Sequence, residues 1–288
     1  MNKKILVFTD LDGTLLDHYT YQTDDAQEMI DKLKQDNIAI IPNSSKTFPE
    51  IELIRQQLSL HSPFITENGA AIYIPVNYFE QQPSDTRLEG QYWVKSFSHS
   101  SEHWQSLLKE FAGDFANFYQ GFSEMSVSEL MALTDLSEDN AKMAKQRQYS
   151  EPLHWTGDQA TQTKFVACME KQGANVLQGG RFLHISGHCN KGQAQQWLAQ
   201  QYSQYAALSS QSEKTLIAPH DEIITIALGD GKNDIAMLEQ ATIAVQIKSP
   251  VHDFPSLERN NNIYQSRQYG PAGWAECLQE ILSSTLIC

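Results

Sequence analysis

Two carboxylates, Asp10 and Asp12, directly follow the apolar run Ile5–Phe8 and precede a Gly-Thr pair. Such a run of β-branched and aromatic residues is typical of a fully buried parallel strand. Carboxylates at the end of a buried strand need a compensating partner, because an unpaired buried charge is strongly destabilising. Mg²⁺ prefers hard oxygen ligands and would be a natural partner. Asp12-Gly13 alone would equally suit an ordinary turn after an edge strand.

Other apolar segments also end on polar residues that could join the two carboxylates. Lys191 stands at the head of a predicted helix. Because ligands in open α/β sheets gather at the carboxyl ends of the strands, we expect these side chains to converge. The segments with their polar residues are 38–41 with Ser44, 63–66 with Glu67 and Asn68, and 223–228 with Asp230, Asn233 and Asp234.

Helices predicted between these strands give the order expected for a parallel sheet. Apolar residues recur at helical spacing over 24–33 and again from Ile51 to Leu58. Thr47 and Glu50 form the pattern of a capping box before the second of these helices. Strand–helix–strand units of this kind predict a doubly wound α/β sheet.

A change of composition marks a domain boundary. The chain turns polar from Gln81 to Leu88. The next hundred residues group helices with strands, including a hairpin across Gly179-Gly180, and so predict a small α+β domain. We therefore expect a core made of residues 1–83 and 187–288, with an inserted domain over residues 84–186.

Taken together, these residues resemble the four motifs of the haloacid dehalogenase-like hydrolases. The match consists of Asp-x-Asp-Gly-Thr after an apolar strand, a strand that ends in a hydroxyl, a lysine, and Gly-Asp-x-x-Asn-Asp, in that order. The insertion lies between the second and third motifs, as in the Cof-type members with a large α/β cap, called C2. The resemblance covers roughly residues 1–80 and 187–288 and implies a Rossmann-like core.

The resemblance implies a Mg²⁺-dependent phosphatase that works through an aspartyl phosphate. Asp10 would be the nucleophile, and Asp12 would protonate the leaving oxygen and then deprotonate the hydrolytic water. The implied metal ligands are the Asp10 and Asp230 carboxylates and the Asp12 backbone carbonyl, with Asn233 and Asp234 behind them, and the implied phosphate ligands are Ser44 and Lys191.

One variation narrows the substrate. Lys46 stands where sugar phosphatases of this type commonly carry Gly-Arg. The string Ser44-Ser45-Lys46-Thr47, together with Glu67-Asn68-Gly69 and the segment 179–184, resembles the mannosyl-3-phosphoglycerate phosphatase branch. That substrate carries a phosphate, a carboxylate and a sugar. A carboxylate is well bound by a bidentate arginine, for which Arg181 is the first candidate and Arg147 the second. The candidate substrate-binding residues are Ser45, Lys46, Glu67, Asn68, Arg181 and His184.

Three other functions stay open at this point. A broad-specificity sugar phosphatase would share the same motifs. A phosphotransferase or mutase would pass the aspartyl phosphate to an acceptor other than water. A binding or regulatory protein on this fold would usually have lost Asp10, Asp12 or Asp230, and none is lost. The chain has no Gly-x-x-x-x-Gly-Lys loop and no dinucleotide fingerprint.

Composition restricts the partners and the compartment. The 288 residues carry a formal net charge of −14, which argues against a broad nucleic-acid or anionic-membrane surface. The apolar runs are too short for a spanning helix, and the four cysteines lack metal-site spacing. We expect a cytoplasmic enzyme whose partner is a small phosphorylated metabolite. The composition does not indicate an oligomeric state.

Overall fold

The computed structural model divides into two compact units. The core unit comprises residues 1–44, 59–95 and 190–288, and the inserted unit comprises residues 45–58 and 96–189. The residues that the structure describes are 3–179, 182–205, 207–208, 215–217 and 222–284.

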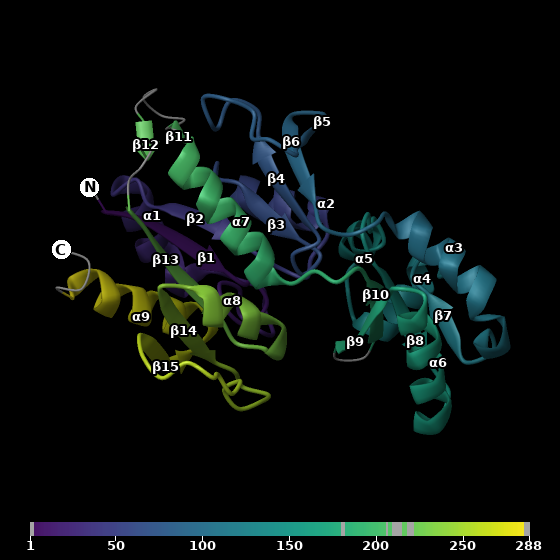
Figure 1. Cartoon of the computed structure of the whole chain (residues 1–288). Helices are drawn as coiled ribbons and strands as arrows, with labels where there is room; N and C mark the ends of the chain where they lie inside the picture. Colours follow the sequence, from purple (N-terminus) through teal and green to yellow (C-terminus); the bar gives the residue numbers. More distant parts are fainter. Residues whose placement is uncertain (1–2, 180–181, 206, 209–214, 218–221, 285–288) are drawn as a thin grey trace. The chain divides into compact units, whose positions relative to one another are not determined.

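A parallel five-stranded sheet forms the centre of the core unit (Figure 1). Its strands follow the order β15-β14-β13-β1-β2, and every neighbouring pair is parallel. The apolar run of β1 is buried from Leu6 to Phe8, as the sequence predicts. The expected parallel α/β sheet is therefore confirmed. The strands are β1 (Lys3–Thr9), β2 (Ala39–Pro42), β13 (Glu222–Gly229), β14 (Ile243–Lys248) and β15 (Ile263–Tyr269).

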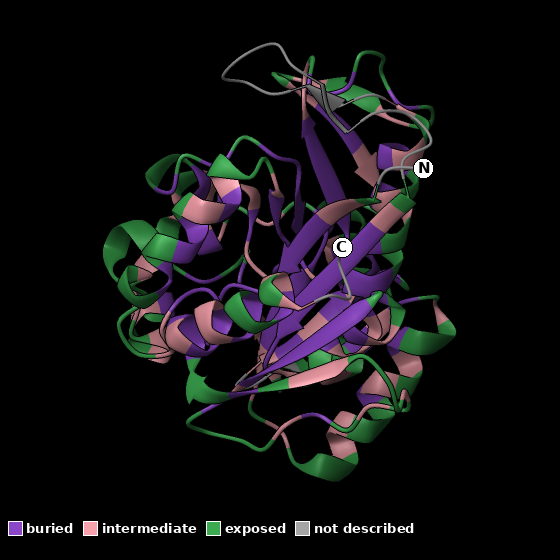
Figure 2. Ribbon diagram, turned by 90° about the vertical axis from the view of Figure 1, so that its left-hand side faces the viewer, coloured by how far each residue is buried: buried purple, intermediate pink, exposed green. Residues whose placement is uncertain are grey.

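Helices cover both faces of this sheet, and Figure 2 shows its central strands as mostly buried, whereas the edge strand β15 is mostly intermediate or exposed. The units β1–α1–β2 and β13–α8–β14 run in opposite directions along the sheet. Right-handed crossovers therefore place α1 and α8 on opposite faces. Helix α9 packs against α1, and α7 packs against α8. These helices are α1 (Gln27–Gln35), α7 (Lys191–Gln204), α8 (Ile235–Gln240) and α9 (Gly270–Ser283).

An antiparallel sheet extends the core unit where the sequence predicted a domain boundary. Its order is β3-β4-β6-β5, and a parallel bridge between Asn43 and Ile65 joins β3 to the end of β2. The polar stretch before β5 is only a connection, closed by a bond from the Gln82 amide to the Thr86 carbonyl. The strands are β3 (Phe64–Thr66), β4 (Ala71–Pro75), β5 (Arg87–Glu89) and β6 (Tyr92–Ser96).

The division therefore differs from the predicted insertion 84–186 at its start. Trp93 and Val94 of β6 are buried, and the strand pairs within the core unit's antiparallel sheet. The inserted unit consequently begins at Ser96 and continues to Cys189. A polar loop followed by a short hairpin resembles a linker in composition, which explains the difference.

The inserted unit is built on an antiparallel sheet of order β7-β8-β10-β9. Trp104, Phe165 and Leu183 belong to one buried cluster, and Phe122 and Leu130 belong to another. The predicted small α+β arrangement is present, while the hairpin tip at residues 180–181 lies outside the described residues. The elements are α3 (Ser101–Phe111), β7 (Tyr119–Gly121), α4 (Val127–Thr134), α5 (Glu138–Ala144), β8 (Glu151–Trp155), α6 (Gln159–Lys171), β9 (Asn175–Gly179) and β10 (Phe182–Ser186).

Helix α2 (Phe48–Gln57) also belongs to the inserted unit, although it follows β2 in the chain. The capping box predicted for the start of this helix is present: the Glu50 carboxylate accepts a hydrogen bond from the Thr47 backbone N–H at 2.9 Å. The Thr47 hydroxyl donates to the Met143 carbonyl at 3.0 Å, and α2 packs against α5. Residues 45–58 therefore group with a different unit from the strands on either side of them.

Strands β11 and β12 pair antiparallel. Helix α9, which the sequence analysis missed, begins with Gly270 and Pro271, whose low helix propensity hides its start. The described residues contain no helix long and apolar enough to cross a membrane. The short elements are η1 (Asp24–Ala26), η2 (Gly113–Phe115), β11 (Ala207–Leu208), β12 (Thr215–Ile217) and η3 (Lys232–Asp234).

Candidate active site

Asp10 lies at the carboxyl end of β1, where the buried strand places it almost out of solvent contact. Asp10 is only 6 % exposed. The Asp10 backbone N–H donates to the Leu228 carbonyl of β13 at 2.9 Å, which continues the parallel pairing by one residue. The first predicted carboxylate is thus held against the strand that leads to Asp230.

Lys191 supplies a buried positive charge beside Asp10. It is the first residue of α7, whose N-cap Asn190 accepts a hydrogen bond from the Gln193 backbone N–H. Lys191 is 0 % exposed, and its Nζ lies 2.5 Å from Asp10 Oδ1 and 2.6 Å from Asp234 Oδ1. A fully buried ammonium needs such partners, because isolated charges are not tolerated in a protein interior.

Asp234 is the second carboxylate partner of Lys191. Its second oxygen accepts a hydrogen bond from the Gly231 backbone N–H at 2.9 Å, so both oxygens have partners. Gly229 makes room for this side chain, because a Cβ at Gly229 would lie 2.5 Å from Asp234 Cβ. Asp234, which the sequence predicted to lie behind the metal ligands, is therefore also a direct partner of Lys191.

Asp230 follows β13 and faces the turn after Asp12. Its Oδ1 accepts a hydrogen bond from the Thr14 hydroxyl at 3.4 Å. Its Oδ2 lies 3.4 Å from His252 Nε2. Gly13 adopts a left-handed φ of +74°, and a Cβ there would lie 2.7 Å from Asp230 Oδ2. Glycine in the first motif thus lets the loop approach the carboxylate closely.

The carboxylates are destabilised in their charged form. Burial raises the pKa of Asp10 to about 7 against the opposing effect of Lys191. Burial, followed by the charge of Asp10, raises the pKa of Asp230 to about 6. Burial also raises the pKa of Asp234. Burial lowers the pKa of Lys191, but Asp10 and Asp234 outweigh it and the net shift is upward. One lysine therefore does not neutralise three buried carboxylates.

This surplus of negative charge fits a divalent cation. Asp10, Asp230 and Asp234 each offer a carboxylate oxygen, and these atoms lie within 4.8 Å of one another. An all-oxygen donor set of this charge suits Mg²⁺ rather than a softer metal. Asp12, the remaining predicted participant on this loop, is half-buried.

The second and third strands bring further predicted residues to this end of the core unit. Ser44 is fully buried, and its backbone carbonyl accepts a hydrogen bond from the Asn68 N–H at 2.9 Å. The Asn68 side chain in turn accepts a hydrogen bond from the Asn233 amide at 3.2 Å. Glu67 is 3 % exposed. Hydrogen bonds therefore connect Ser44, Asn68 and Asn233 at this end of the core unit. Glu67 precedes Asn68 in the same turn.

The turn at Glu67–Gly69 has an unusual backbone. Glu67, Asn68 and Gly69 have φ values of +48°, +60° and +91°. Non-glycine residues in this region are uncommon and persist where the surroundings hold them. A Cβ at Gly69 would lie 2.2 Å from the Asn190 carbonyl oxygen, so this turn packs directly on the peptide that precedes Lys191.

Other predicted substrate residues lie in the inserted unit. The Arg147 guanidinium donates from Nη1 to the Ser45 carbonyl at 2.9 Å, and Lys46 Nζ is 4.0 Å from Glu50. Burial, and less strongly the charge of Arg147, lowers the pKa of His184 to about 3, which keeps the imidazole neutral. Arg181, the first candidate for a carboxylate, lies outside the described residues.

Two contacts of the site were not expected from the sequence. Thr14 belongs to the first motif, and its hydroxyl group could have indicated from the sequence that it joins the site. His252 lies in the loop after β14, and a lone histidine in a loop gives no sequence pattern that would have linked it to Asp230.

A family model described as haloacid dehalogenase-like hydrolase matches residues 7–252. The chain belongs to this family. A solved Thermoplasma acidophilum structure shares the fold of this hydrolase with a TM-score of 0.63 at 15 % identity, covering 98 % of this chain and 99 % of the other.

Two curated relatives of this hydrolase carry the same name, glucosyl-3-phosphoglycerate/mannosyl-3-phosphoglycerate phosphatase. The Methanococcoides burtonii protein is 32 % identical over 279 residues, which cover 97 % of each chain. The Persephonella marina protein is 31 % identical over 283 residues, again 97 % of each chain. The sequence resemblance to this superfamily and branch is thereby confirmed.

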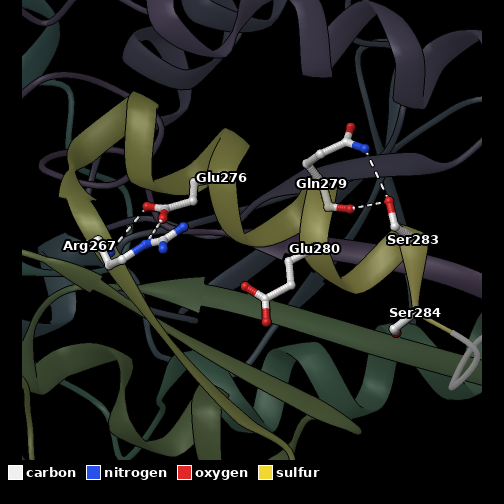
Figure 3. A pocket seen from close by; sticks show the side chains of 6 residues that line it. All are labelled: Arg267, Glu276, Gln279, Glu280, Ser283 and Ser284. Atoms are coloured by element: carbon white, nitrogen blue, oxygen red, sulfur yellow. Dashed lines mark hydrogen bonds and ion pairs between the residues drawn. The ribbon is translucent and has the colours of Figure 1, made fainter.

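A surface hollow of the hydrolase is lined by residues other than those of the candidate site. It has a volume of about 490 Å³ and is lined by residues of α9 and the strand before it (Figure 3). Arg267 and Glu276 form an ion pair across it, and Glu276 also accepts a hydrogen bond from the Gln268 N–H at 3.1 Å. The pair joins β15 to α9.

Proposed function

We propose that this hydrolase removes phosphate from mannosyl-3-phosphoglycerate or a related sugar or glycerate phosphate, with Mg²⁺ and an aspartyl-phosphate intermediate. Family membership and the names of the relatives make the chain a phosphoric monoester hydrolase. The observation that carries the finer proposal is the buried group of Asp10, Asp230 and Asp234 around Lys191. It offers a nucleophile, a cation site and a phosphate-binding cation within one sheet edge.

The first chemical step requires an oxygen nucleophile, a proton donor and compensation of phosphoryl charge. Asp10 attacks phosphorus as its carboxylate, the bond to the leaving oxygen breaks, and Asp12 gives that oxygen a proton. Ser44 and Lys191 bind phosphoryl oxygens, Lys191 as a point charge. The Asp10 and Asp230 carboxylates and the Asp12 carbonyl would hold Mg²⁺, which supplies positive charge to the transferring phosphoryl group.

Hydrolysis of the intermediate regenerates the enzyme. Asp12, now deprotonated, takes a proton from water, whose oxygen attacks phosphorus and releases the Asp10 carboxylate. Asp234 positions the lysine through its 2.6 Å contact, and Asn233 would act behind the metal ligands, held by its bond to Asn68. A phosphotransferase or mutase would use the same first step but a different acceptor, so release of free phosphate separates the two functions.

Inorganic phosphate release across a panel of esters tests the proposal. We expect turnover of mannosyl- and glucosyl-3-phosphoglycerate with Mg²⁺, and a loss of at least about a hundredfold when EDTA removes the metal, because three buried carboxylates then oppose an anionic substrate. Adding back Mg²⁺ should restore the rate. Undiminished turnover in EDTA would contradict the metal role, and equal turnover of all sugar phosphates would favour the broad-specificity alternative.

We further propose that the inserted unit, predicted over residues 84–186, supplies substrate specificity. Its candidates for the glycerate carboxylate are Arg181 and Arg147, and the neutral His184 can exchange hydrogen bonds with sugar hydroxyls. Arg147 also holds the Ser45 carbonyl, so its guanidinium is fixed beside the residue that follows Ser44 in the chain.

Replacing Arg181 or Arg147 with alanine separates carboxylate binding from general phosphate binding. We expect replacement of the responsible arginine to lower kcat/KM for mannosyl-3-phosphoglycerate by an amount equivalent to about 2–4 kcal/mol, the range for truncating a buried charge partner. The loss should be small for p-nitrophenyl phosphate, which has no carboxylate. Lys142→Ala, at an exposed cation paired with Glu138, is the matched control. Equal losses on both substrates would remove the glycerate assignment and leave the phosphatase.

A further inference from the structure

A chain of hydrogen bonds runs from helix α9 to the backbone of Asp10. The Trp274 indole Nε1–H donates to the Thr9 hydroxyl at 3.1 Å, and this hydroxyl donates to the Asp10 carbonyl at 2.7 Å. Thr9 and Trp274 are both 0 % exposed. Because the hydroxyl accepts one bond and donates another, its orientation is set by the indole.

These bonds act at the point where the strand stops. Strand β1 ends at Thr9, while the Asp10 N–H still donates to the Leu228 carbonyl at 2.9 Å. The Thr9 hydroxyl binds the carbonyl on the other side of Asp10. Both backbone polar groups of Asp10 are therefore held, one by β13 and the other by a side chain that α9 orients.

The same turn of α9 approaches the loop that follows Asp10. A Cβ at Gly270, whose φ is +48°, would be 3.7 Å from Asp17 Cα and 3.9 Å from the Gly13 carbonyl. A Cβ at Gly273 would lie 2.3 Å from the Gln268 carbonyl. The distances at Gly270 are ordinary contacts, so glycine there serves the left-handed φ, whereas Gly273 lets the first turn of α9 pack tightly against the end of β15, one residue before Trp274.

We propose that Thr9 and Trp274 are positioning residues for the nucleophile. They fix the Asp10–Leu11 peptide and through it the direction of the Asp10 carboxylate. The inference rests on the proposed function, in which Asp10 attacks phosphorus. In-line attack depends strongly on this direction, because a displacement of about 1 Å in a reacting group can cost roughly a hundredfold in rate.

A set of near-isosteric variants tests this role. Thr9→Val removes the hydroxyl, Thr9→Ser retains it, and Trp274→Phe removes the indole N–H. Thr225→Val is the matched control, because Thr225 is a buried threonine of the adjacent strand whose hydroxyl contacts Thr242. Each variant is assayed with p-nitrophenyl phosphate and Mg²⁺, and its unfolding is followed in urea.

We expect Thr9→Val and Trp274→Phe each to lower kcat and the rate of phosphoenzyme formation about tenfold, with KM changed less than twofold. The double variant should be no slower than the slower single one, because both act through one hydrogen bond to Asp10. Thr9→Ser should keep most of the activity, and Thr225→Val should keep the wild-type kcat whatever its stability.

A wild-type kcat in folded Thr9→Val, measured well below its unfolding midpoint, would overturn the inference and reduce the bonds to a structural role. Losses that multiply in the double variant would overturn it as well. If Trp274→Phe does not fold, the comparison of Thr9→Val with Thr9→Ser decides alone. Failure of the proposed function gives a different result, because Asp10→Asn would then keep its activity whatever the Thr9 variants do.

Discussion

Asp10→Asn is expected to lower kcat by about 10³-fold or more, equivalent to about 4 kcal/mol in the activation barrier. The amide has nearly the shape of the carboxylate but is a very poor nucleophile, so no phosphoenzyme should accumulate. Rapid-quench detection of acid-stable phosphoprotein and steady-state phosphate release measure the two aspects separately.

The fold should survive this change, which makes the result readable. Lys191 keeps its contact with Asp234 at 2.6 Å, so the buried ammonium still has a carboxylate partner. Asp17→Asn is a suitable control, because Asp17 accepts backbone hydrogen bonds from Tyr19 and Thr20 in the same segment and has no assigned chemistry. Normal turnover by Asp10→Asn would remove the nucleophile assignment.

Lys191→Met is the second large effect, and it acts on stability as well as on rate. The lysine is fully buried between Asp10 and Asp234. Removing one partner of a buried charge group typically costs about 3–5 kcal/mol, because the remaining charges are left uncompensated. We expect a loss of that size in the free energy of unfolding in metal-free buffer, together with at least about a hundredfold lower kcat.

A second substitution tests the electrostatic cause. Lys191→Met combined with Asp234→Asn should recover part of the lost stability, because one of the two uncompensated carboxylates is gone. Mg²⁺ should also stabilise the single variant more than the wild type. If the two substitutions destabilise additively in urea titrations, the loss comes from packing and not from charge.

The sequence predicts a candidate site at the ends of apolar strands, because carboxylates follow those strands directly. Asp10 and Asp230 stand immediately after buried runs, and topology alone brings such positions together. For Asp234 the sequence predicted only a position behind the metal ligands. Its direct bond to Lys191 depends on the short turn η3, whose geometry no periodicity reveals.

The parts that the sequence did not predict depend on contacts between distant residues. Trp274 bonds Thr9 across most of the chain, and neither residue belongs to a local pattern that would link it to the other. Helix α2 shows an apolar face from Ile51 onward, but that face does not reveal that its partner is α5. Hydrophobic spacing predicts that a face is buried, not what buries it.

The pairing of β1 with β13 has a consequence for how the protein is made. Lys3 pairs with Glu222, so one edge of the first strand finds its partner only after roughly two hundred further residues have been synthesised. During translation that edge is an exposed apolar strand, the kind of surface that associates with other chains. Lys191, Asp230 and Asp234 also emerge late. A nascent chain therefore carries Asp10 for most of its synthesis before the residues that lie beside it in the folded protein exist.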